Sequence, residues 1–375
     1  MRTRGAVLFE APGEWEIVDL EVDEPRQSEL LVKMVAAGLC HSDDHYAKGD
    51  APAPLPLAGG HEGAGVVIGV GPNTPGWSAG DHVVMSFLPA CGRCRWCASG
   101  QQNLCDMGRY LRDGTREDGS FRLSHPGHDH DIAQMCGIST FCETTLIDTA
   151  AAVKVEPDLP LTSVCLTGCG VGTGWGSAVN SAEVRPGQTV IVMGVGGIGA
   201  NAVQGARHAG AGHLLAVDPI PQKREVAGSL GATEAFETMA EAIDRARVLT
   251  NGQGADATII CTGVLLPEHV RQAFDSIRKA GIVVVTALGN ADDDLAVNAR
   301  ELTLFQKRIQ GSVFGGSNPT SDIPLMLDLY RSGVLLLDEL VTATYPLEDI
   351  NRGYTDLHNG RNMRGIITFS DGLTT

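Results

Sequence analysis

The hydrophobic pattern changes in character along the chain. Up to residue 85, short apolar runs broken by Gly and Pro, such as Glu29–Val35 and Gly65–Val70, predict strands. From Thr189 to Ser312, apolar runs rich in β-branched residues alternate with stretches of helical spacing. Such short, continuously apolar runs are typical of buried parallel strands. The alternation therefore predicts a doubly wound α/β sheet in this part of the chain.

Several elements can be given limits from this pattern. The expected strands of the α/β region are Thr189–Met193, His213–Val217, Ala257–Cys261, Ile282–Thr286 and Ile309–Ser312, and the expected helices span 198–209, 221–230 and 267–279. The tail after residue 320 is expected to hold one helix, Ile323–Ser332, and a closing strand, Gly365–Phe369.

Composition excludes several classes of function. A chain of 375 residues is too long for one ordinary hydrophobic core, so two domains are expected. The net charge of −17 argues against binding DNA or RNA, whose phosphates need a basic surface. No apolar run approaches the roughly 18 residues that span a membrane, and the N-terminus has no signal-peptide pattern. We expect a cytoplasmic protein whose ten cysteines are thiols or metal ligands.

A glycine-rich turn directly follows the expected strand Thr189–Met193 and opens the expected helix. Its sequence is Gly194-Val195-Gly196-Gly197-Ile198-Gly199. In this context Gly194 allows a tight turn, Gly196 lets the backbone approach a pyrophosphate, and Gly199 lets helix and strand pack. The helix N-terminus would then face the phosphates with free N–H groups.

Asp218 closes the next expected strand. A carboxylate at this position accepts hydrogen bonds from a ribose 2′-hydroxyl and repels a 2′-phosphate, which favours NAD over NADP. Lys223 follows within reach of the same ribose. Arg224 beside it could bind a 2′-phosphate, so NADP remains an alternative cofactor. The alternative is a glycine turn and a surface Asp in an unrelated α/β protein.

Four cysteines lie within fifteen residues, in the pattern Cys91-x2-Cys94-x2-Cys97-x7-Cys105. Four thiolates fill the tetrahedron of a structural zinc and leave no position for water. An iron–sulfur cluster is the alternative, since C-x2-C-x2-C also occurs in ferredoxins. There the fourth Cys usually precedes Pro, whereas Cys105 precedes Asp106, so the sequence favours zinc.

A second set of metal ligands is scattered. Cys40, the pair His61-Glu62, and Cys169 lie in Gly-rich segments, and no spacing rule connects them. Single Cys and His residues in such segments are more often core or turn residues than ligands. A Cys2His set would nevertheless suit a catalytic zinc with an open fourth position. The histidines at positions 125, 128 and 130 are expected in a solvated loop.

Five ordered motifs resemble those of the zinc-containing medium-chain alcohol dehydrogenases. They are Gly38–His45, Gly60–Gly65, the four-cysteine segment, Gly168-Cys169-Gly170 and Gly194–Gly199, and the likeness continues through Thr173–Ala178 and Asn362–Gly365. The resemblance covers nearly the whole chain. It implies an α/β protein with a GroES-like, mostly β catalytic domain at 1–170 and 314–375 and a doubly wound Rossmann domain at 171–313.

The resemblance implies two zinc ions per chain. Cys40, His61 and Cys169 would bind the catalytic zinc, and the four clustered cysteines would bind the structural one. Glu62 would lie behind the catalytic metal as an alternate ligand. Asp43 would hydrogen-bond the second nitrogen of His61 and raise its basicity.

The resemblance also implies roles in catalysis and cofactor binding. Ser42 would take the proton of the bound alcohol and pass it through the cofactor ribose to His45 near solvent. His41 and Arg364 would face the pyrophosphate, and Thr173 would lie against the nicotinamide. Zinc lowers the pKa of the alcohol, and the resulting alkoxide expels hydride readily.

The expected reaction is reversible hydride transfer between a primary or secondary alcohol and NAD. The expected partners are a small-molecule alcohol or aldehyde and further copies of the chain in a homodimer or homotetramer, with no nucleic acid and no membrane. An apolar alcohol is suggested by the expected wall residues of the pocket, which are Leu57, Phe87, Phe141 and Leu288.

Some residues leave the branch of the family open. His41 stands where many members carry Arg, and the glutathione-dependent formaldehyde branch also has Cys-His here. Arg109 matches a basic residue which that branch uses for the glutathione carboxylate, but residues 50–54 lack the second acidic residue expected for the glutathione amine. Oxidation of an S-hydroxymethyl thiol adduct is therefore an alternative function.

The segments Gly315–Pro319 and Asp322–Pro324 are most similar to actinobacterial alcohol dehydrogenases. Some of these hold NAD so firmly that they turn over only with an artificial electron acceptor, which makes a nicotinoprotein a further hypothesis. An alternative from another class is a catalytically inactive, crystallin-like relative. Such a protein should have lost some of the catalytic positions, but all of them are present: Cys40, Ser42, His61 and Cys169.

Overall fold

The computed structural model describes residues 1–126, 131–290 and 293–369, so His128 and His130 lie outside the described residues. The chain forms two compact units. Unit 1 consists of Met1–Cys169, Asn318–Ser332 and Leu337–Thr375, and unit 2 of Gly170–Ser317 and Gly333–Leu336. The domain limits expected near residues 170 and 314 stay predictions.

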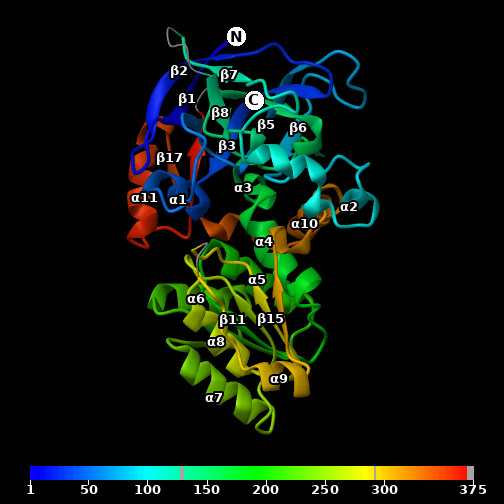
Figure 1. Ribbon diagram of the computed structural model, residues 1–375, viewed down its shortest axis with the longest axis vertical. Helices are drawn as coiled ribbons and strands as arrows, with labels where there is room; N and C mark the ends of the chain where they lie inside the picture. Colours follow the sequence, from blue (N-terminus) through cyan, green and yellow to red (C-terminus); the bar gives the residue numbers. More distant parts are fainter. Residues whose placement is uncertain (127–130, 291–292, 370–375) are drawn as a thin grey trace. The chain divides into compact units, whose positions relative to one another are not determined.

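Unit 1 contains a closed barrel with the strand order β1-β2-β7-β8-β4 (Figure 1). Its strands are β1 (Arg2–Leu8), β2 (Glu16–Val22), β4 (Leu57–Ala58), β7 (Leu123–Ser124) and β8 (Asp131–Gln134). Val7, Leu20, Leu123 and Ile132 are buried together in one of its apolar clusters. Because β4 ends at Ala58, the chain leaves the barrel just before the predicted ligand His61.

A second sheet of unit 1 has the order β10-β6-β5-β3-β18-β17, and β9 also pairs with β3. Its strands are β3 (Glu29–Gly38), β5 (Gly63–Val70), β6 (His82–Met85), β9 (Thr144–Asp148), β10 (Ala152–Val155), β17 (Val341–Tyr345) and β18 (Arg364–Thr368). Gly38, at the end of β3, pairs with Ile366 of β18. This pairing brings the C-terminal strand beside the segment that leads to Cys40.

Helices complete unit 1. They are α1 (His41–Lys48), α2 (Arg95–Ala98), α3 (Leu161–Val164), α10 (Pro319–Arg331) and α11 (Ile350–His358). The prediction of a single helix in the tail was wrong, because α11 follows α10. Gly353 lowers the intrinsic helix propensity of this segment, and burial of Ile350 and Tyr354 in a core cluster stabilises the helix instead. Within the described ranges, no helix has the length and apolar character that a bilayer crossing requires.

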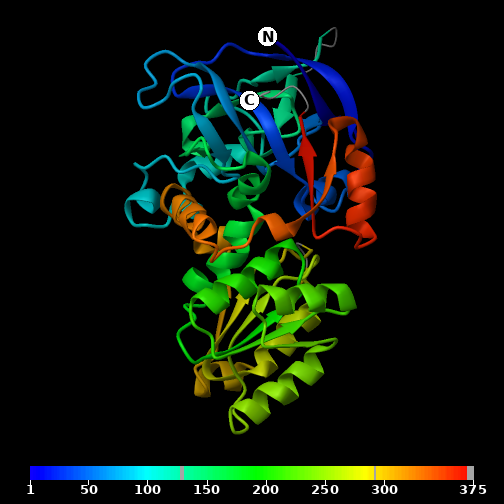
Figure 2. The ribbon, with the colours of Figure 1, turned by 180° about the vertical axis from the view of Figure 1, so that it is seen from behind.

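Unit 2 is a parallel sheet with the order β13-β12-β11-β14-β15-β16. Its strands are β11 (Thr189–Met193), β12 (His213–Val217), β13 (Glu234–Phe236), β14 (Ala255–Ile260), β15 (Ile277–Val285) and β16 (Arg308–Gly311). Its helices are α4 (Gly170–Gly176), α5 (Gly197–His208), α6 (Pro221–Leu230), α7 (Met239–Leu249), α8 (Pro267–Ser276) and α9 (Ala299–Leu304). Figures 1 and 2 show helices on both faces of this sheet, which confirms the predicted doubly wound architecture.

The predicted strands and helices of the α/β region are all present, but β13, α7 and α9 were not predicted, and the boundary between α8 and β15 differs. β11, β12 and α6 have the predicted limits, whereas α8 ends at Ser276 and β15 begins at Ile277, five residues before the predicted start. Residues 278–280 are not buried, and a register shift interrupts the pairing of β14 with β15. The polar start of β15 lacks the apolar pattern of a buried strand, so the pattern could not reveal it.

A buried ion-pair network fixes one side of unit 1. Glu29, the first residue of β3, is 3% exposed. It accepts hydrogen bonds from Arg116 Nε (2.8 Å) and Arg122 Nε (2.7 Å). Burial alone would raise the pKa of the Glu29 carboxyl, but the two guanidinium groups hold that pKa below its usual range. Glu29 thus ties residues 116–122 to β3.

We expect Glu29→Ala to lower the free energy of unfolding by about 3–5 kcal/mol, because Arg116 and Arg122 would keep buried charges without their partner. Calorimetry should then show a fall of roughly 6 °C or more in the unfolding midpoint. As a control, Glu143→Ala removes a surface ion pair with Arg4, which should be worth less than about 1 kcal/mol. Equal shifts for the two variants would contradict this interpretation.

Candidate functional site

Asp43 organises the start of α1. Cys40 is the residue that precedes the helix, and its backbone N–H donates to Asp43 Oδ2 (3.1 Å). The other carboxylate oxygen, Asp43 Oδ1, accepts from His61 Nδ1 (2.8 Å). Burial raises the pKa of the Asp43 carboxyl, and the neighbouring His61 opposes this rise. One buried carboxylate therefore connects the start of α1 to the imidazole of His61.

His61 and Glu62 lie in the turn between β4 and β5, and both are buried. Gly60 has a φ of +89°, and a Cβ there would lie 2.5 Å from Thr140 Oγ1 and 2.6 Å from the Phe141 nitrogen. Glycine is therefore needed for this close turn. Because β5 pairs with β3, the turn is placed beside the end of β3 and the start of α1.

Four potential metal ligands converge in unit 1. Cys40, His61, Glu62 and Cys169 each offer one atom, and these atoms lie within 4.8 Å of one another. His61 Nε2 is buried and has no hydrogen-bond partner within the described ranges. Two sulfurs and one imidazole are ligands that zinc accepts, and a buried imidazole nitrogen without a protein partner is free to be one of them. The residues present fit a zinc ion.

The protonation of these ligands also fits metal binding. A hydrogen bond from Cys169 lowers the pKa of Cys40 well below its usual value, and the same contact raises the pKa of Cys169. Burial lowers the pKa of His61, but Asp43 and Cys40 raise it well above the usual range. A zinc ion at this site would take the place of these shared protons.

Glu62 and Arg364 form an ion pair in the interior of unit 1. Arg364 lies at the start of β18, and its guanidinium contacts Glu62 Oε2 and donates to the Leu39 carbonyl (3.3 Å). Burial raises the pKa of the Glu62 carboxyl, and Arg364 counteracts this rise. The structure thus places Arg364, expected at a pyrophosphate, against Glu62.

The two predicted proton carriers lie on α1. Ser42 Oγ is 3.7 Å from Cys40 Sγ, so its hydroxyl lies beside the ligand cluster. His45 follows three residues later, and residues with this spacing share a helix face. His45 Nδ1 lies 3.1 Å from Asp50 Oδ2, and the His45 side chain is 18% exposed.

The Phe87 ring meets the His61 ring edge-on, at a centroid distance of 6.0 Å.

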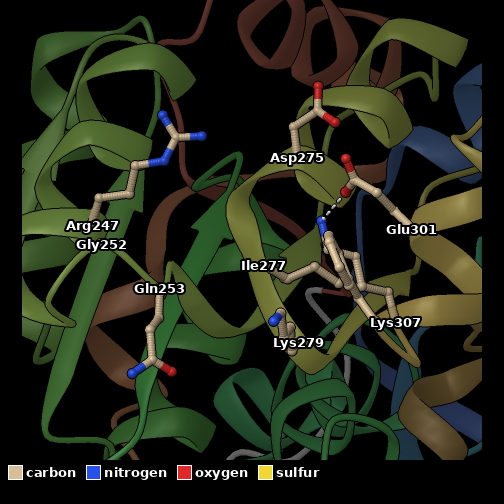
Figure 3. A pocket seen from close by; sticks show the side chains of 9 residues that line it. Arg247, Gly252, Gln253, Asp275, Ile277, Lys279, Glu301 and Lys307 are labelled. Atoms are coloured by element: carbon tan, nitrogen blue, oxygen red, sulfur yellow. Dashed lines mark hydrogen bonds and ion pairs between the residues drawn. The ribbon is translucent and has the colours of Figure 1, made fainter.

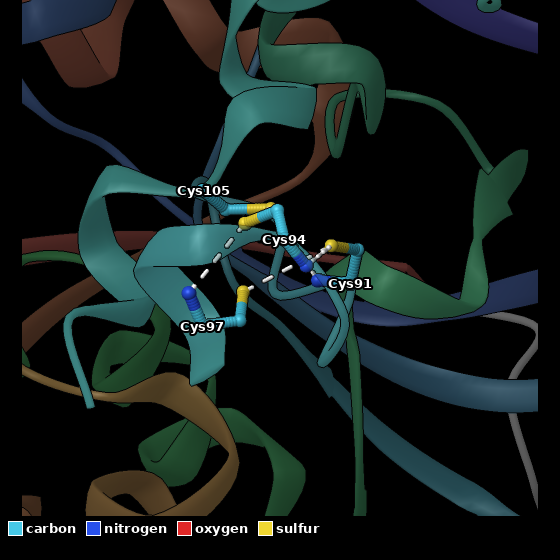
Figure 4. Close-up of side chains that lie close together, drawn as sticks. All are labelled: Cys91, Cys94, Cys97 and Cys105. Carbon is cyan, nitrogen blue, oxygen red and sulfur yellow. Dashed lines mark hydrogen bonds between the residues drawn. The ribbon is translucent and has the colours of Figure 1, made fainter. Parts of the chain in front are cut away.

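The four clustered cysteines converge as predicted (Figure 4). Cys91 Sγ lies 4.0 Å from Cys97 Sγ, and Cys94 Sγ lies 3.9 Å from Cys105 Sγ. These distances exclude disulfides, and each thiol is free. The backbone N–H of Cys97 donates to the Cys94 sulfur and lowers the pKa of that thiol to about 6. Four converging sulfurs fit a structural zinc.

The predicted phosphate-binding turn lies between β11 and α5 in unit 2. Gly194 has a φ of +89°, and a Cβ there would lie 2.8 Å from the Cys261 carbonyl oxygen. A Cβ at Gly199 would collide with the Gly194 carbonyl oxygen, whereas a Cβ at Gly196 would meet nothing within 4 Å. Gly194 and Gly199 are therefore required by packing, and the space at Gly196 fits a dinucleotide phosphate. Gly197 and Ile198 begin the first turn of α5.

Asp218 follows β12 and is 5% exposed. Its Oδ2 atom accepts from the Val195 nitrogen and its Oδ1 atom from the Ile220 nitrogen, at 2.8 and 2.9 Å. These two bonds hold the carboxylate beside the glycine turn and leave lone pairs for a ribose. Arg224 Nη1 donates to the carbonyl oxygens of Asp218 and Pro219. The Arg224 guanidinium, which left NADP possible as the cofactor, is therefore already hydrogen-bonded to backbone carbonyls.

The other residues predicted to bind the cofactor or a glutathione adduct differ in their burial. Thr173 lies in α4, is buried, and its carbonyl accepts from Ser177 Oγ (2.6 Å). Lys223 lies in α6 and is partly buried. His41 is the first residue of α1, and its side chain is exposed. Arg109 lies on the surface beside Tyr110 and Glu117.

A separate cavity of about 630 Å³ lies in unit 2 (Figure 3). Its walls include Arg247 of α7, Asp275 of α8, Lys279 of β15, Glu301 of α9 and Lys307, which directly precedes β16. Lys307 Nζ is already satisfied by Glu301 Oε2 and the Phe274 carbonyl, at 2.8 Å each. None of the predicted site residues lines this cavity.

The sequence did not reveal two neighbours of the metal ligands. The ion pair of Arg364 with Glu62 joins residues that are far apart in the chain, and only the pairing of β18 with β3 brings them together. Tyr354, on the unpredicted helix α11, has Asp43 among the groups that raise its pKa. No spacing signal connects α11 to α1, so neither contact could be found from the sequence.

Comparison with known proteins is consistent with this geometry. Residues 26–158 match the alcohol dehydrogenase GroES-like domain, and residues 197–332 match the zinc-binding dehydrogenase domain. The NDMA-dependent alcohol dehydrogenase of Amycolatopsis methanolica is 48% identical and covers 99% of this chain and all of its own. The S-(hydroxymethyl)glutathione dehydrogenase of Synechocystis is 36% identical, over 98% of this chain and all of its own. The crystal structure of benzyl alcohol dehydrogenase from Acinetobacter calcoaceticus has a TM-score of 0.91 at 29% identity, and the match covers 99% of this chain and all of that one.

These matches bear out the predicted GroES-like and Rossmann-type domains. Full-length similarity at 48% identity extends the match beyond single domains to the whole enzyme. The chain therefore belongs to the zinc-containing medium-chain alcohol dehydrogenases and is a zinc-dependent, NAD-linked alcohol dehydrogenase.

Proposed function

We propose that this enzyme oxidises its alcohol at a zinc ion held by Cys40, His61 and Cys169 and reduces NAD bound at Gly194–Gly199. The observation that carries the proposal is His61 Nε2, which is buried and partnerless within the described ranges, in a cluster whose ligand atoms lie within 4.8 Å. Zinc bound here supplies a positive charge that lowers the pKa of an alcohol hydroxyl. The four clustered cysteines hold a second, structural zinc.

The surrounding residues prepare this site. Asp43 accepts from His61 Nδ1, which keeps that nitrogen protonated and turns Nε2 toward the two sulfurs. Glu62 is held beside the ligands by its contact with Arg364, where an alternate ligand has to lie. Phe87 supplies an apolar wall next to His61. The Phe87 ring supports an apolar alcohol as substrate.

The proton of the alcohol leaves through side chains of α1. Ser42 Oγ lies beside the Cys40 sulfur, where it accepts the alcohol proton. His45 is on the same helix and partly exposed, so it exchanges that proton with water. The passage from Ser42 to His45 through the cofactor ribose stays a prediction, as do the contacts of His41 and Arg364 with the pyrophosphate.

In unit 2, the open space at Gly196 and the N-terminus of α5 support binding of the pyrophosphate. Asp218 accepts from a ribose hydroxyl and repels a 2′-phosphate, so NAD is preferred over NADP. Lys223 interacts with the same ribose, and Thr173 contacts the nicotinamide. We further propose that NAD stays bound during turnover, in line with the NDMA-dependent relative.

The alternative functions have less support. Arg109, the residue expected for a glutathione carboxylate, is exposed and beside Glu117, and residues 50–54 supply no second acidic group. The catalytically inactive alternative conflicts with the intact ligand cluster. We propose a homodimer or homotetramer, because β16 is an edge strand whose residues are largely exposed. We also propose that the enzyme is cytoplasmic, where its free cysteines would stay reduced.

Removal of one proposed ligand tests the catalytic zinc. The wild-type enzyme should contain two zinc ions per chain, and Cys169→Ala only one. Turnover should fall by more than about 10³-fold, because several kcal/mol of charge stabilisation are lost. Cys142→Ala, which removes a buried thiol in the barrel, should retain both ions and most activity. Two ions in Cys169→Ala would refute the assignment.

Replacement of Ser42 tests the proton path. Ser42→Ala should lower kcat by about 10²–10⁴-fold, the usual value of general acid–base catalysis, while the zinc content stays at wild-type level. Ser42→Thr keeps a hydroxyl at the same place and should recover much of the rate. A Ser42→Ala variant with wild-type kcat would exclude Ser42 from the path.

Nucleotide retention tests the bound-cofactor hypothesis. After gel filtration, denatured enzyme should release NAD in a stoichiometric amount and no NADP. Benzyl, terpene-type and straight-chain alcohols should be oxidised with an artificial electron acceptor more rapidly than with added NAD. The elution volume of the same gel filtration gives the molecular mass, which tests the proposed homodimer or homotetramer. Nucleotide-free protein that rapidly reduces added NAD would show that the cofactor exchanges freely.

A further inference from the structure

The C-terminal helix α11 packs against α1, the helix that follows Cys40. His358 Nε2 lies 2.8 Å from Asp44 Oδ2, and Lys48 Nζ lies 2.8 Å from the same oxygen. Tyr354 is four residues before His358, so the two side chains share one face of α11. That face meets two consecutive buried carboxylates of α1, because Asp43 precedes Asp44.

The Tyr354 hydroxyl has no evident packing purpose. The side chain belongs to an apolar cluster with Trp15 and Phe141, and its ring meets the Phe141 ring edge-on at 6.5 Å. Its hydroxyl is buried and has no hydrogen-bond partner among the described residues. An unsatisfied buried hydroxyl costs about 1–3 kcal/mol, and Phe would fill the same space without that cost. The hydroxyl group therefore calls for a function other than packing.

The neighbours of this hydroxyl indicate that it acts as a donor. Burial and then the Asp43 carboxylate raise the pKa of Tyr354 well above its usual value, so the phenol keeps its proton. Asp43 accepts from His61 Nδ1 and from the Cys40 backbone N–H. A carboxylate offers about four lone-pair positions, so Asp43 can take one more donor.

We propose that Tyr354 is a positioning residue for the zinc ligand His61: its hydroxyl donates to the Asp43 carboxylate, and α11 thereby fixes the Asp43–His61 pair. This inference rests on the proposed function, in which His61 binds the catalytic zinc. With three donors on Asp43, the carboxylate cannot rotate away from His61 Nδ1. His61 Nε2 then keeps its direction toward Cys40 and Cys169 when zinc is bound.

The rate of zinc release from the holoenzyme tests the proposal without reference to turnover. Outer partners of metal ligands typically contribute about 10–100-fold to metal affinity. Tyr354→Phe should therefore release one zinc ion about 10-fold faster into a chromophoric chelator, and the ion of the four cysteines serves as the internal reference. Loss of the proposed bond to Asp43 should also lower the unfolding midpoint, so the zinc release rate is the readout that separates positioning from stability.

Tyr345→Phe is the matched control. Tyr345 lies in the same apolar cluster, and its hydroxyl donates to Asp356 Oδ2 (3.0 Å) and accepts from Asn362 Nδ2 (3.2 Å). Its loss should lower the unfolding midpoint but leave both release rates unchanged. If Tyr354→Phe releases zinc at the wild-type rate, or if Tyr345→Phe accelerates release equally, the positioning role is overturned.

A further variant separates this inference from the proposed function. Asp43→Asn weakens the acceptor that Tyr354 and His61 share, so it should accelerate release of the same ion. Fast release from Asp43→Asn together with wild-type release from Tyr354→Phe would overturn only the role of Tyr354. Retention of both ions in Cys169→Ala would instead overturn the proposed zinc site itself.

Discussion

The geometry of unit 1 depends on the buried carboxylate of Asp43. It accepts from the backbone of Cys40 and from the ring of His61, so one side chain sets the relative position of two groups that arrive from different strands. A buried carboxylate needs such donors, because burial without them is costly. The two N–H donors therefore stabilise the buried carboxylate, and the carboxylate in turn fixes the positions of the two donors. Ser42 and His45 lie on α1, whose first turn Asp43 stabilises through the Cys40 backbone.

In unit 2, the predicted cofactor-binding groups are positioned mainly by backbone conformation and backbone hydrogen bonds. The turn after β11 works because Gly194 and Gly199 have no Cβ at points where another atom already occupies the space. Asp218 is held at the end of β12 by two backbone N–H groups, one of them from Val195 within that turn. The phosphate-binding turn and the ribose-binding carboxylate are thus parts of one hydrogen-bonded structure.

Sequence reasoning succeeded where a local rule applies. The apolar pattern of β11 and β12, the glycine spacing and the Cys91–Cys105 pattern each describe a short segment whose conformation depends mainly on itself. It failed at α11, whose Gly353 argues against a helix, and at the polar start of β15. Helix α11 forms because the burial of Ile350 and Tyr354 outweighs its weak local propensity, whereas the polar start of β15 has no apolar pattern that could reveal a strand. The resemblance to a known family, rather than spacing, pointed to Cys40, His61 and Cys169 as one set.

The sequence by itself determined the four clustered thiols and the dinucleotide turn, and it indicated the Cys2His set through the resemblance to a known family. The tertiary structure decided which groups meet. The contacts of Arg364 with Glu62 and of Phe87 with His61 join residues from different segments of the chain. The physical reason is the range of the interactions. Backbone conformation and thiol spacing are local, whereas the partners of a buried charge come from whichever segments share its surroundings, and these can be hundreds of residues apart.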